Sequence, residues 1–167
     1  WNYGKAGKRL IILGIDPGSR FCGFGILQTE KNRLVAAGCD VIKVNPNLKL
    51  SERLLLIYNK ISEVVKEYKP DVAVVETIFY GKNIKSAFTL GHVRGVILLA
   101  LENFGAEIAE YSPREVKKSV VGNGNASKEQ VKFMVQKITK QTSDSEDATD
   151  ALAIALCHFN KIKYLRK

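Results

Sequence analysis

The run Leu10-Ile-Ile-Leu-Gly-Ile15 decides the fold, and Asp16-Pro-Gly-Ser19 closes it. The apolar residues predict a strand, and the tetrad that follows predicts a turn, because Pro fixes φ and Gly tolerates positive φ. Asp16 therefore stands at the end of an apolar strand. An unpaired charge is costly in such a place unless something binds it.

The elements that follow predict one mixed sheet. Two strands, over about 22–29 and 33–44, come after short polar turns, so the first three strands should form an antiparallel meander. Later strands are predicted over about 72–76 and 106–111, with helices over about 50–68, 84–103 and 113–120, from Ser127, and from after Ser143 to about Phe159. Ser127 with Gln130, and Ser143 with Glu146, have the spacing of capping boxes. The order predicts an α/β fold with a five-stranded sheet flanked by helices.

The chain of 167 residues predicts a single domain over 9–160, with a basic tail over 161–167. Residues 1–8 lack periodicity and are interpreted as a cloning remnant or a disordered arm. We expect no membrane span, because no stretch approaches about 20 apolar residues, and no signal peptide. Three widely spaced cysteines without a C-x-x-C pattern predict reduced thiols and a cytoplasmic location.

Three more carboxylates occupy positions comparable to that of Asp16. Glu76 ends the apolar strand Val72–Val75, and Asp147 and Asp150 share one face in the first turn of the last helix. If that helix packs beside the first strand, all four acids converge. Their hard oxygen atoms suit Mg²⁺ or Mn²⁺, and such clusters can hold two ions about 3.5–4 Å apart. Taken singly, Asp16 could be a turn residue, and the helical pair could complement the helix dipole.

The charge of the chain points to a polyanionic partner. The net charge is +9 and the pI about 9.5, which fits nucleic acid but also basic ribosomal or membrane-surface proteins. Basic residues outnumber acidic ones over 77–101 and 112–140, and the alternative is a solvated helix face. The candidate phosphate contacts are Lys82, Lys85, Arg94, Arg114, Lys117, Lys118 and Lys128. Acids at element ends in a cationic chain predict a metal-dependent nuclease.

Seven motifs carry a family resemblance. They are Ile12-Leu-Gly-Ile-Asp-Pro-Gly-Ser-Arg20, Val75-Glu-Thr-Ile-Phe79, Gly81-Lys-Asn83, Ser86 with Leu90-Gly-His-Val-Arg-Gly95, Glu110-Tyr-Ser-Pro-Arg-Glu-Val-Lys117, Val120-Val-Gly-Asn-Gly124 and Asp147-Ala-Thr-Asp-Ala-Leu-Ala-Ile-Ala155. In this order, over about residues 9–160, the set resembles the RuvC family of bacterial Holliday-junction resolvases.

The resemblance implies a ribonuclease H-like fold, a homodimer, and paired Mg²⁺-dependent nicks in opposing strands of a four-way DNA junction. It also implies branch-migration proteins as partners. The family's catalytic acids fall on Asp16, Glu76, Asp147 and Asp150. Its basic positions near the scissile phosphate fall on Lys117 and Lys128, and its stacking aromatic residue falls on Phe79.

Two questions stay open at the level of sequence. Gly91 and Gly95 lie four residues apart on one helix, which fits either core packing or a dimer interface, and a twofold junction favours the dimer. A non-catalytic junction-binding protein and a related nuclease acting on RNA are the alternative functions. An actin-like or Hsp70-like ATPase is excluded, because 167 residues cannot hold the two copies of the fold that it needs.

Overall fold

The computed structural model describes residues 9–30, 33–77, 84–141 and 145–164. Its strands are β1 (Ile11–Asp16), β2 (Phe21–Glu30), β3 (Arg33–Lys43), β4 (Val72–Glu76) and β5 (Glu107–Tyr111). They form one sheet in the order β3-β2-β1-β4-β5. The first three strands are antiparallel, and β4 and β5 run parallel to β1. The predicted meander and mixed sheet are confirmed.

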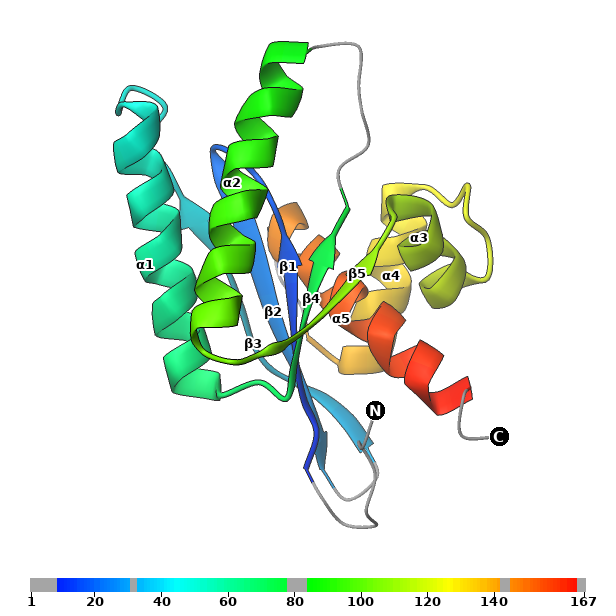
Figure 1. Cartoon of the computed structure of the whole chain (residues 1–167). Helices are drawn as coiled ribbons and strands as arrows, with labels where there is room; N and C mark the ends of the chain where they lie inside the picture. Colours follow the sequence, from blue (N-terminus) through cyan, green and yellow to red (C-terminus); the bar gives the residue numbers. More distant parts are fainter. Residues whose placement is uncertain (1–8, 31–32, 78–83, 142–144, 165–167) are drawn as a thin grey trace.

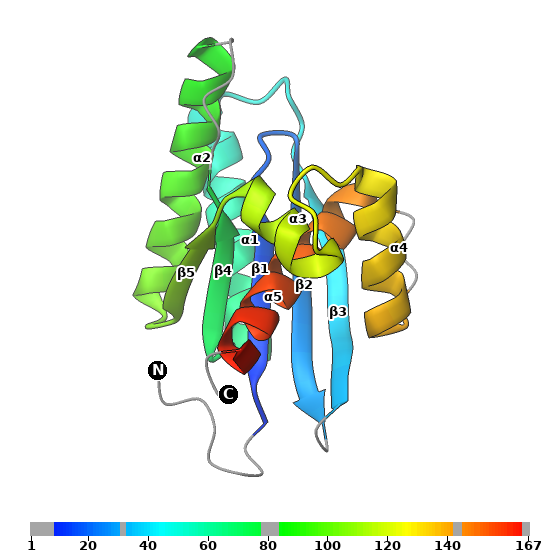
Figure 2. The ribbon, with the colours of Figure 1, turned by 90° about the vertical axis from the view of Figure 1, so that its right-hand side faces the viewer.

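Helices cover both faces of this sheet. The helices are α1 (Leu50–Tyr68), α2 (Ile84–Asn103), α3 (Pro113–Val121), α4 (Lys128–Thr139) and α5 (Glu146–Tyr164). Figure 1 shows α1 and α2 on one side of the sheet, with α3, α4 and α5 on the other, and Figure 2 looks onto the second group. Alternate residues of β1 serve the two cores, because Leu13 and Ile15 pack towards α1 and α2 while Ile12 packs towards α5.

Glycines let α5 approach the sheet closely. A Cβ atom added at Gly14 would lie 2.0 Å from the carbonyl oxygen of Ala151, and one added at Gly23 would lie 2.1 Å from that of Asp147. These separations are far below a van der Waals contact. A side chain at either of these two positions would therefore lift the first turns of α5 away from the strand ends.

Two helix boundaries bear on the predictions. The capping box of α4 is confirmed, because Ser127 Oγ accepts a hydrogen bond from Gln130 N at 3.3 Å and Gln130 Oε1 accepts one from Ser127 N at 2.9 Å. The second predicted box, between Ser143 and Glu146, is not tested: α5 begins at Glu146, and Ser145 Oγ accepts a hydrogen bond from Ala148 N at 3.4 Å. Ser143 lies outside the described residues.

Helix α5 also continues past the expected end at Phe159, to Tyr164. Ile162 is buried in this last part, and Lys161 Nζ pairs with Glu115 Oε1 at 2.8 Å. The extra turn is thus held by packing and by an ion pair with α3, two contacts that its basic composition did not indicate.

Helix α2 contradicts one expectation. By length and composition it could cross a membrane, although a single such helix is weak evidence that it does. Much of its apolar surface is uncovered, with Ile84 71% and Phe88 67% exposed. A Cβ atom added at Gly91 or Gly95 would meet nothing within 4 Å. The pair of glycines is therefore on an open face and takes no part in the core.

Candidate active site

Asp16 and Glu76 end neighbouring parallel strands. Ile15 of β1 lies opposite Val75 of β4, so the two acids follow side by side at the same edge of the sheet. The alternation of side chains places both on the α5 face: Asp16 has the parity of Gly14, which faces α5, and Glu76 that of Val74, which packs in the α5-side core. The carboxyl ends of such strands are where ligand sites gather.

The start of α5 supplies the other two acids, with Asp147 in the first turn and Asp150 just after it, whereas the sequence predicted both in the first turn. The carbonyl of Asp147 lies over Gly23, and Gly23 is the β2 partner of Asp16. Asp150 follows three residues later on the same face of the helix. The predicted packing of this helix beside the first strand is therefore what the structure contains.

A cavity of about 250 Å³ opens between these strand ends, α3, α4 and α5. Its lining residues are Asp16, Glu76, Pro113, Val116, Lys117, Lys128, Val131, Asp150 and Ala153. Three of the four predicted acids thus share one cavity. Asp147 is not part of the wall, although its charge acts on Asp16.

Burial and mutual repulsion disfavour the ionised acids. Burial is the largest cause of the raised pKa of Asp16, which reaches about 8, and the other three carboxylates raise it further. Burial also raises the pKa of Glu76 to about 7, with repulsion from Asp150 as the next cause. The pKa of Asp150 is raised by burial as well, against the opposing effect of Lys128. The site therefore holds negative charge that is incompletely balanced.

Two lysines supply part of that balance. Lys128 Nζ lies 3.2 Å from Asp150 Oδ2, and its charge lowers the pKa values of Asp16, Glu76 and Asp150. Lys117, on the α3 side of the cavity, lowers the pKa of Glu76.

The position of α3, and with it Lys117, is fixed by contacts with α5. Besides the ion pair of Lys161 with Glu115, Asn160 Nδ2 donates a hydrogen bond to Ser119 O at 3.0 Å. The hydrogen bond from Lys161, then those from Ser112, lower the pKa of Glu115 to about 2. Glu115 thus stays ionised and keeps α3 attached at ordinary pH.

The carboxylates fit a divalent cation by their chemistry. They offer only hard oxygen donors, and a cation would relieve the repulsion and burial that raise their pKa values. Among the described residues, no three Asp, Glu, His or Cys side chains already form a metal-binding group. Side-chain rotation would be needed to bring the carboxylate oxygens around an ion.

The other predicted DNA contacts are scattered around this centre. Phe79 and Lys82 lie outside the described residues. Lys85 is exposed on α2, whereas the guanidinium of Arg94, further along α2, is paired with Glu110 of β5. Arg114 and Lys118 are exposed on α3. Among the members of the set that the structure describes, Lys117 and Lys128 line the cavity and the others do not.

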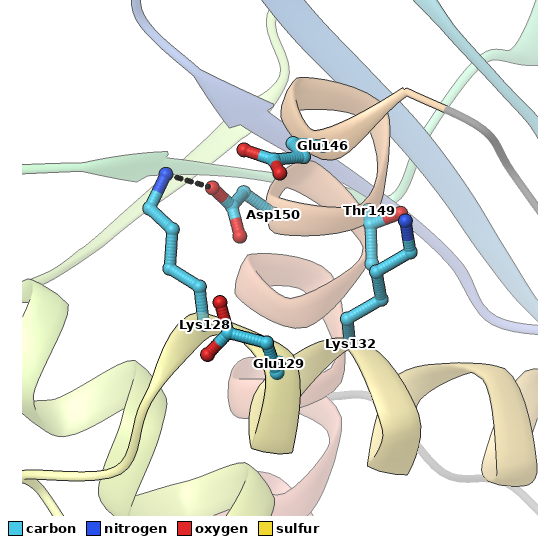
Figure 3. Close-up of a pocket in the computed structure, with 6 residues that line it drawn as sticks. All are labelled: Lys128, Glu129, Lys132, Glu146, Thr149 and Asp150. Atoms are coloured by element: carbon cyan, nitrogen blue, oxygen red, sulfur yellow. Dashed lines mark hydrogen bonds and ion pairs between the residues drawn. The ribbon is translucent and has the colours of Figure 1, made fainter.

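Sequence reasoning overlooked Glu146 and the apolar wall of the cavity. Glu146 lines a second, smaller pocket beside Lys128 and Asp150, between the first turns of α4 and α5 (Figure 3). Its position next to Asp147 was the available signal. Pro113, Val116 and Val131 gave no signal of their own, because apolar residues at these spacings are usual in a core.

Comparison with known proteins identifies the family. The family model for crossover junction endodeoxyribonuclease RuvC matches residues 12–158. A relative of that name from Hahella chejuensis is 48% identical over 154 residues, covering 90% of this chain and 88% of the relative. The one from Ruminiclostridium cellulolyticum is 42% identical over 153 residues, covering 90% and 92%.

Solved structures agree with the sequence comparison. The Thermus thermophilus RuvC structure matches with a TM-score of 0.85 at 30% identity, over 93% of this chain and 96% of that one. A structure of the same protein in complex with a Holliday junction substrate matches with a TM-score of 0.86 at 29% identity, over the same shares. The chain belongs to the RuvC family of crossover junction endodeoxyribonucleases.

Proposed function

We propose that this chain is an endonuclease that resolves four-way DNA junctions by paired phosphodiester hydrolysis in opposing strands. The family membership supports a nuclease acting on junctions, since a RuvC relative is solved with a Holliday junction. The observation in this chain that carries the proposal is the cavity in which Asp16, Glu76 and Asp150 meet Lys117 and Lys128. A junction-binding protein without catalysis would gain nothing from buried carboxylates that repel phosphate.

We infer that Asp16, Glu76, Asp147 and Asp150 hold two Mg²⁺ ions, with Mn²⁺ as an alternative. The chemistry that divalent ions supply at such sites is activation of the attacking water and stabilisation of the leaving 3′ oxygen. The protein's part is to hold the carboxylates at the ends of β1 and β4 and near the start of α5. The apolar residues Val116 and Val131 limit the water around them.

Lys117 and Lys128 are proposed to hold the phosphate being cut. Both line the cavity with the acids, and both are long enough to reach an anion there. Lys128 is also the first residue of α4, where the helix dipole favours an anion. Lys85, Arg114 and Lys118 would contact the junction arms, with Lys82 and Phe79 as further contacts by family resemblance.

The uncovered face of α2 is proposed to form a homodimer. Ile84, Phe88 and Leu99 are exposed on this helix, and the open space at Gly91 and Gly95 leaves room for a partner helix. A second copy is the fitting occupant, because two sites related by a twofold axis match a junction with twofold symmetry. Action on DNA also fits the bacterial cytoplasm and cooperation with branch-migration proteins.

A cleavage assay tests the function. Synthetic four-way junctions, linear duplex and an RNA–DNA hybrid are incubated with the protein, with and without Mg²⁺. We expect paired nicks in the junction alone, and only with the metal. Cleavage of the hybrid in preference to the junction would favour the alternative of an RNA-directed nuclease.

A variant separates catalysis from binding. Asp150→Asn should lose cleavage while junction binding is kept or strengthened, because one negative charge facing the phosphates is removed. Asp40→Asn is the matched control, since Asp40 is exposed on β3 and its backbone contact, Val41 N to Oδ1 at 2.7 Å, can be kept by an amide oxygen. Normal cleavage by Asp150→Asn would refute the proposed site.

A further inference from the structure

Lys128 is paired with a carboxylate of the site, in addition to being suited to bind phosphate. Its Nζ lies 3.2 Å from Asp150 Oδ2, while 65% of its side chain is exposed against 29% for Asp150. Figure 3 shows the lysine reaching from the start of α4 across to Asp150. Glu146 lies one helical turn before Asp150 on α5 and lines the same pocket. The ammonium therefore sits at the mouth of the acidic cavity.

The position of Lys128 is determined by its backbone. It is the first residue of α4, directly after the Ser127 cap, and the capping box uses Ser127 and Gln130 without involving the lysine side chain. Val131 and Val135 of the same helix are buried and pack α4 against α5. The lysine stem thus starts from a fixed point, while its charged end can move.

The ammonium acts on several acids at once. Its charge lowers the pKa values of Asp16, Glu76 and Asp150, and its own pKa is raised by Asp150, then also by Glu146 and Asp16. Lys117 acts on Glu76. The geometry agrees, because Lys128 lines one cavity with Asp16, Glu76 and Asp150 and its Nζ lies 3.2 Å from Asp150 Oδ2, which is the position of a counter-ion for these three acids.

We propose that Lys128 is a resident counter-ion of the carboxylates, which competes with the divalent ion for Asp150 and must leave Asp150 before the ion binds there. This inference rests on the proposed metal site. An exposed ion pair is weak and its lysine stem flexible, so the exchange needs no change in the fold. A lysine displaced from Asp150 is then available to a phosphate oxygen, which gives one side chain two successive partners.

The test is the affinity for Mn²⁺ in the absence of DNA, measured by titration with detection of free Mn²⁺ by electron paramagnetic resonance. Lys128→Ala should bind Mn²⁺ about threefold to tenfold more tightly than the wild type, because the competing charge is gone. Lys128→Arg keeps a cation and should stay near the wild-type affinity. The gain in melting temperature on adding Mn²⁺ should also be larger for Lys128→Ala.

Lys132→Ala is the matched control. It removes the same charge one turn later on α4, from a lysine that extends towards Thr149 in the same pocket (Figure 3). Equal effects of the two alanine variants would overturn the inference, since general electrostatics would then explain both. The inference would also be overturned if Lys128→Ala bound Mn²⁺ no more tightly than the wild type, whatever the result for Lys132→Ala.

The metal site itself is checked separately. Asp16→Asn should weaken Mn²⁺ binding strongly. If the wild type binds Mn²⁺ and Asp16→Asn weakens it, a failure of the Lys128 variants counts against the counter-ion alone. If the wild type binds no Mn²⁺, or Asp16→Asn binds it as well as the wild type, the proposed metal site fails and the inference with it.

Discussion

Replacing Asp16 by Asn should stabilise the metal-free protein, although we expect the same change to abolish cleavage. The folded carboxyl has a pKa of about 8, against 3.8 for an ordinary aspartate. At pH 7 the unfolded chain therefore releases a proton that the folded chain keeps. The gap between pH 7 and 3.8 is about 3 units, which corresponds to about 4 kcal/mol at about 1.4 kcal/mol per unit.

Water entering the open cavity lowers this penalty, so we expect a gain of about 1–3 kcal/mol for Asp16→Asn at pH 7. The direction follows from proton binding. Between pH 3.8 and about 8 the folded state holds more protons than the unfolded state, so wild-type stability falls as the pH rises. The advantage of the variant should thus be largest near pH 8 and vanish near pH 4. The raised pKa of Glu76, about 7, acts in the same direction.

Urea denaturation in the presence of a chelator, at pH values from 4 to 8, measures this difference. Asp40→Asn is the control, because its carboxylate is exposed and its change should stay within about 0.5 kcal/mol at every pH. If Asp16→Asn is no more stable than the wild type at pH 7, or if its advantage does not shrink towards pH 4, the carboxylate is not destabilising the fold. The repulsive character of the site would then be refuted.

Three further changes test other parts of the molecule. Lys117→Ala should weaken junction binding and reduce the slope of log affinity against log salt by about one, as measured by anisotropy over a salt series. Gly95→Leu should stay folded by circular dichroism, because nothing lies within 4 Å of the added Cβ in the monomer. It should be a monomer by light scattering and make slow single nicks, because the larger side chain would obstruct the partner helix of the proposed dimer. Gly14→Ala should cost about 3 kcal/mol or more in urea denaturation, because its Cβ would lie 2.0 Å from Ala151 O.

The sequence predicted the sheet and the acids well because both depend on short-range patterns. A strand alternates its faces, so the parity of Asp16 and Glu76 relative to their apolar neighbours already places them on one side. The i,i+3 spacing of Asp147 and Asp150 likewise needs only a helix. The two pairs meet only because α5 packs beside β1. That packing is a tertiary contact, and the sequence analysis could only assume it.

Side-chain pairings between distant elements could not be predicted. The lack of acids in its own segment predicts that Arg94 contacts phosphate, yet Glu110 of the next strand pairs with it. Lys128 was expected to face phosphate, and its ion pair with Asp150 depends on how α4 meets α5. For α2 the sequence held the signal that we missed: residues 86–103 contain only Arg94 and Glu102 as charged residues.

The acids can converge because glycines occupy positions of the sheet that face α5. On the face of the sheet that carries Asp16, positions 14, 23 and 25 are glycine, and Cβ atoms there would collide with α5 at 2.0, 2.1 and 2.8 Å. The helix can therefore come close enough to bring Asp147 and Asp150 to the strand ends. Repulsion among the carboxylates opposes this approach, whereas the burial of Leu152, Ile154 and Leu156 favours it.

Packing and repulsion act at different parts of α5. The large apolar residues Leu152, Ile154 and Leu156 lie in the middle of the helix, and Asp147 and Asp150 lie near its start. Repulsion therefore acts at the start of the helix, which lies over Gly23, while the apolar residues hold the rest of it packed on Gly14 and Gly25. A cation that neutralises the cluster would relieve this repulsion, and Lys128 can do so only in part, because its single charge faces Asp16, Glu76 and Asp150.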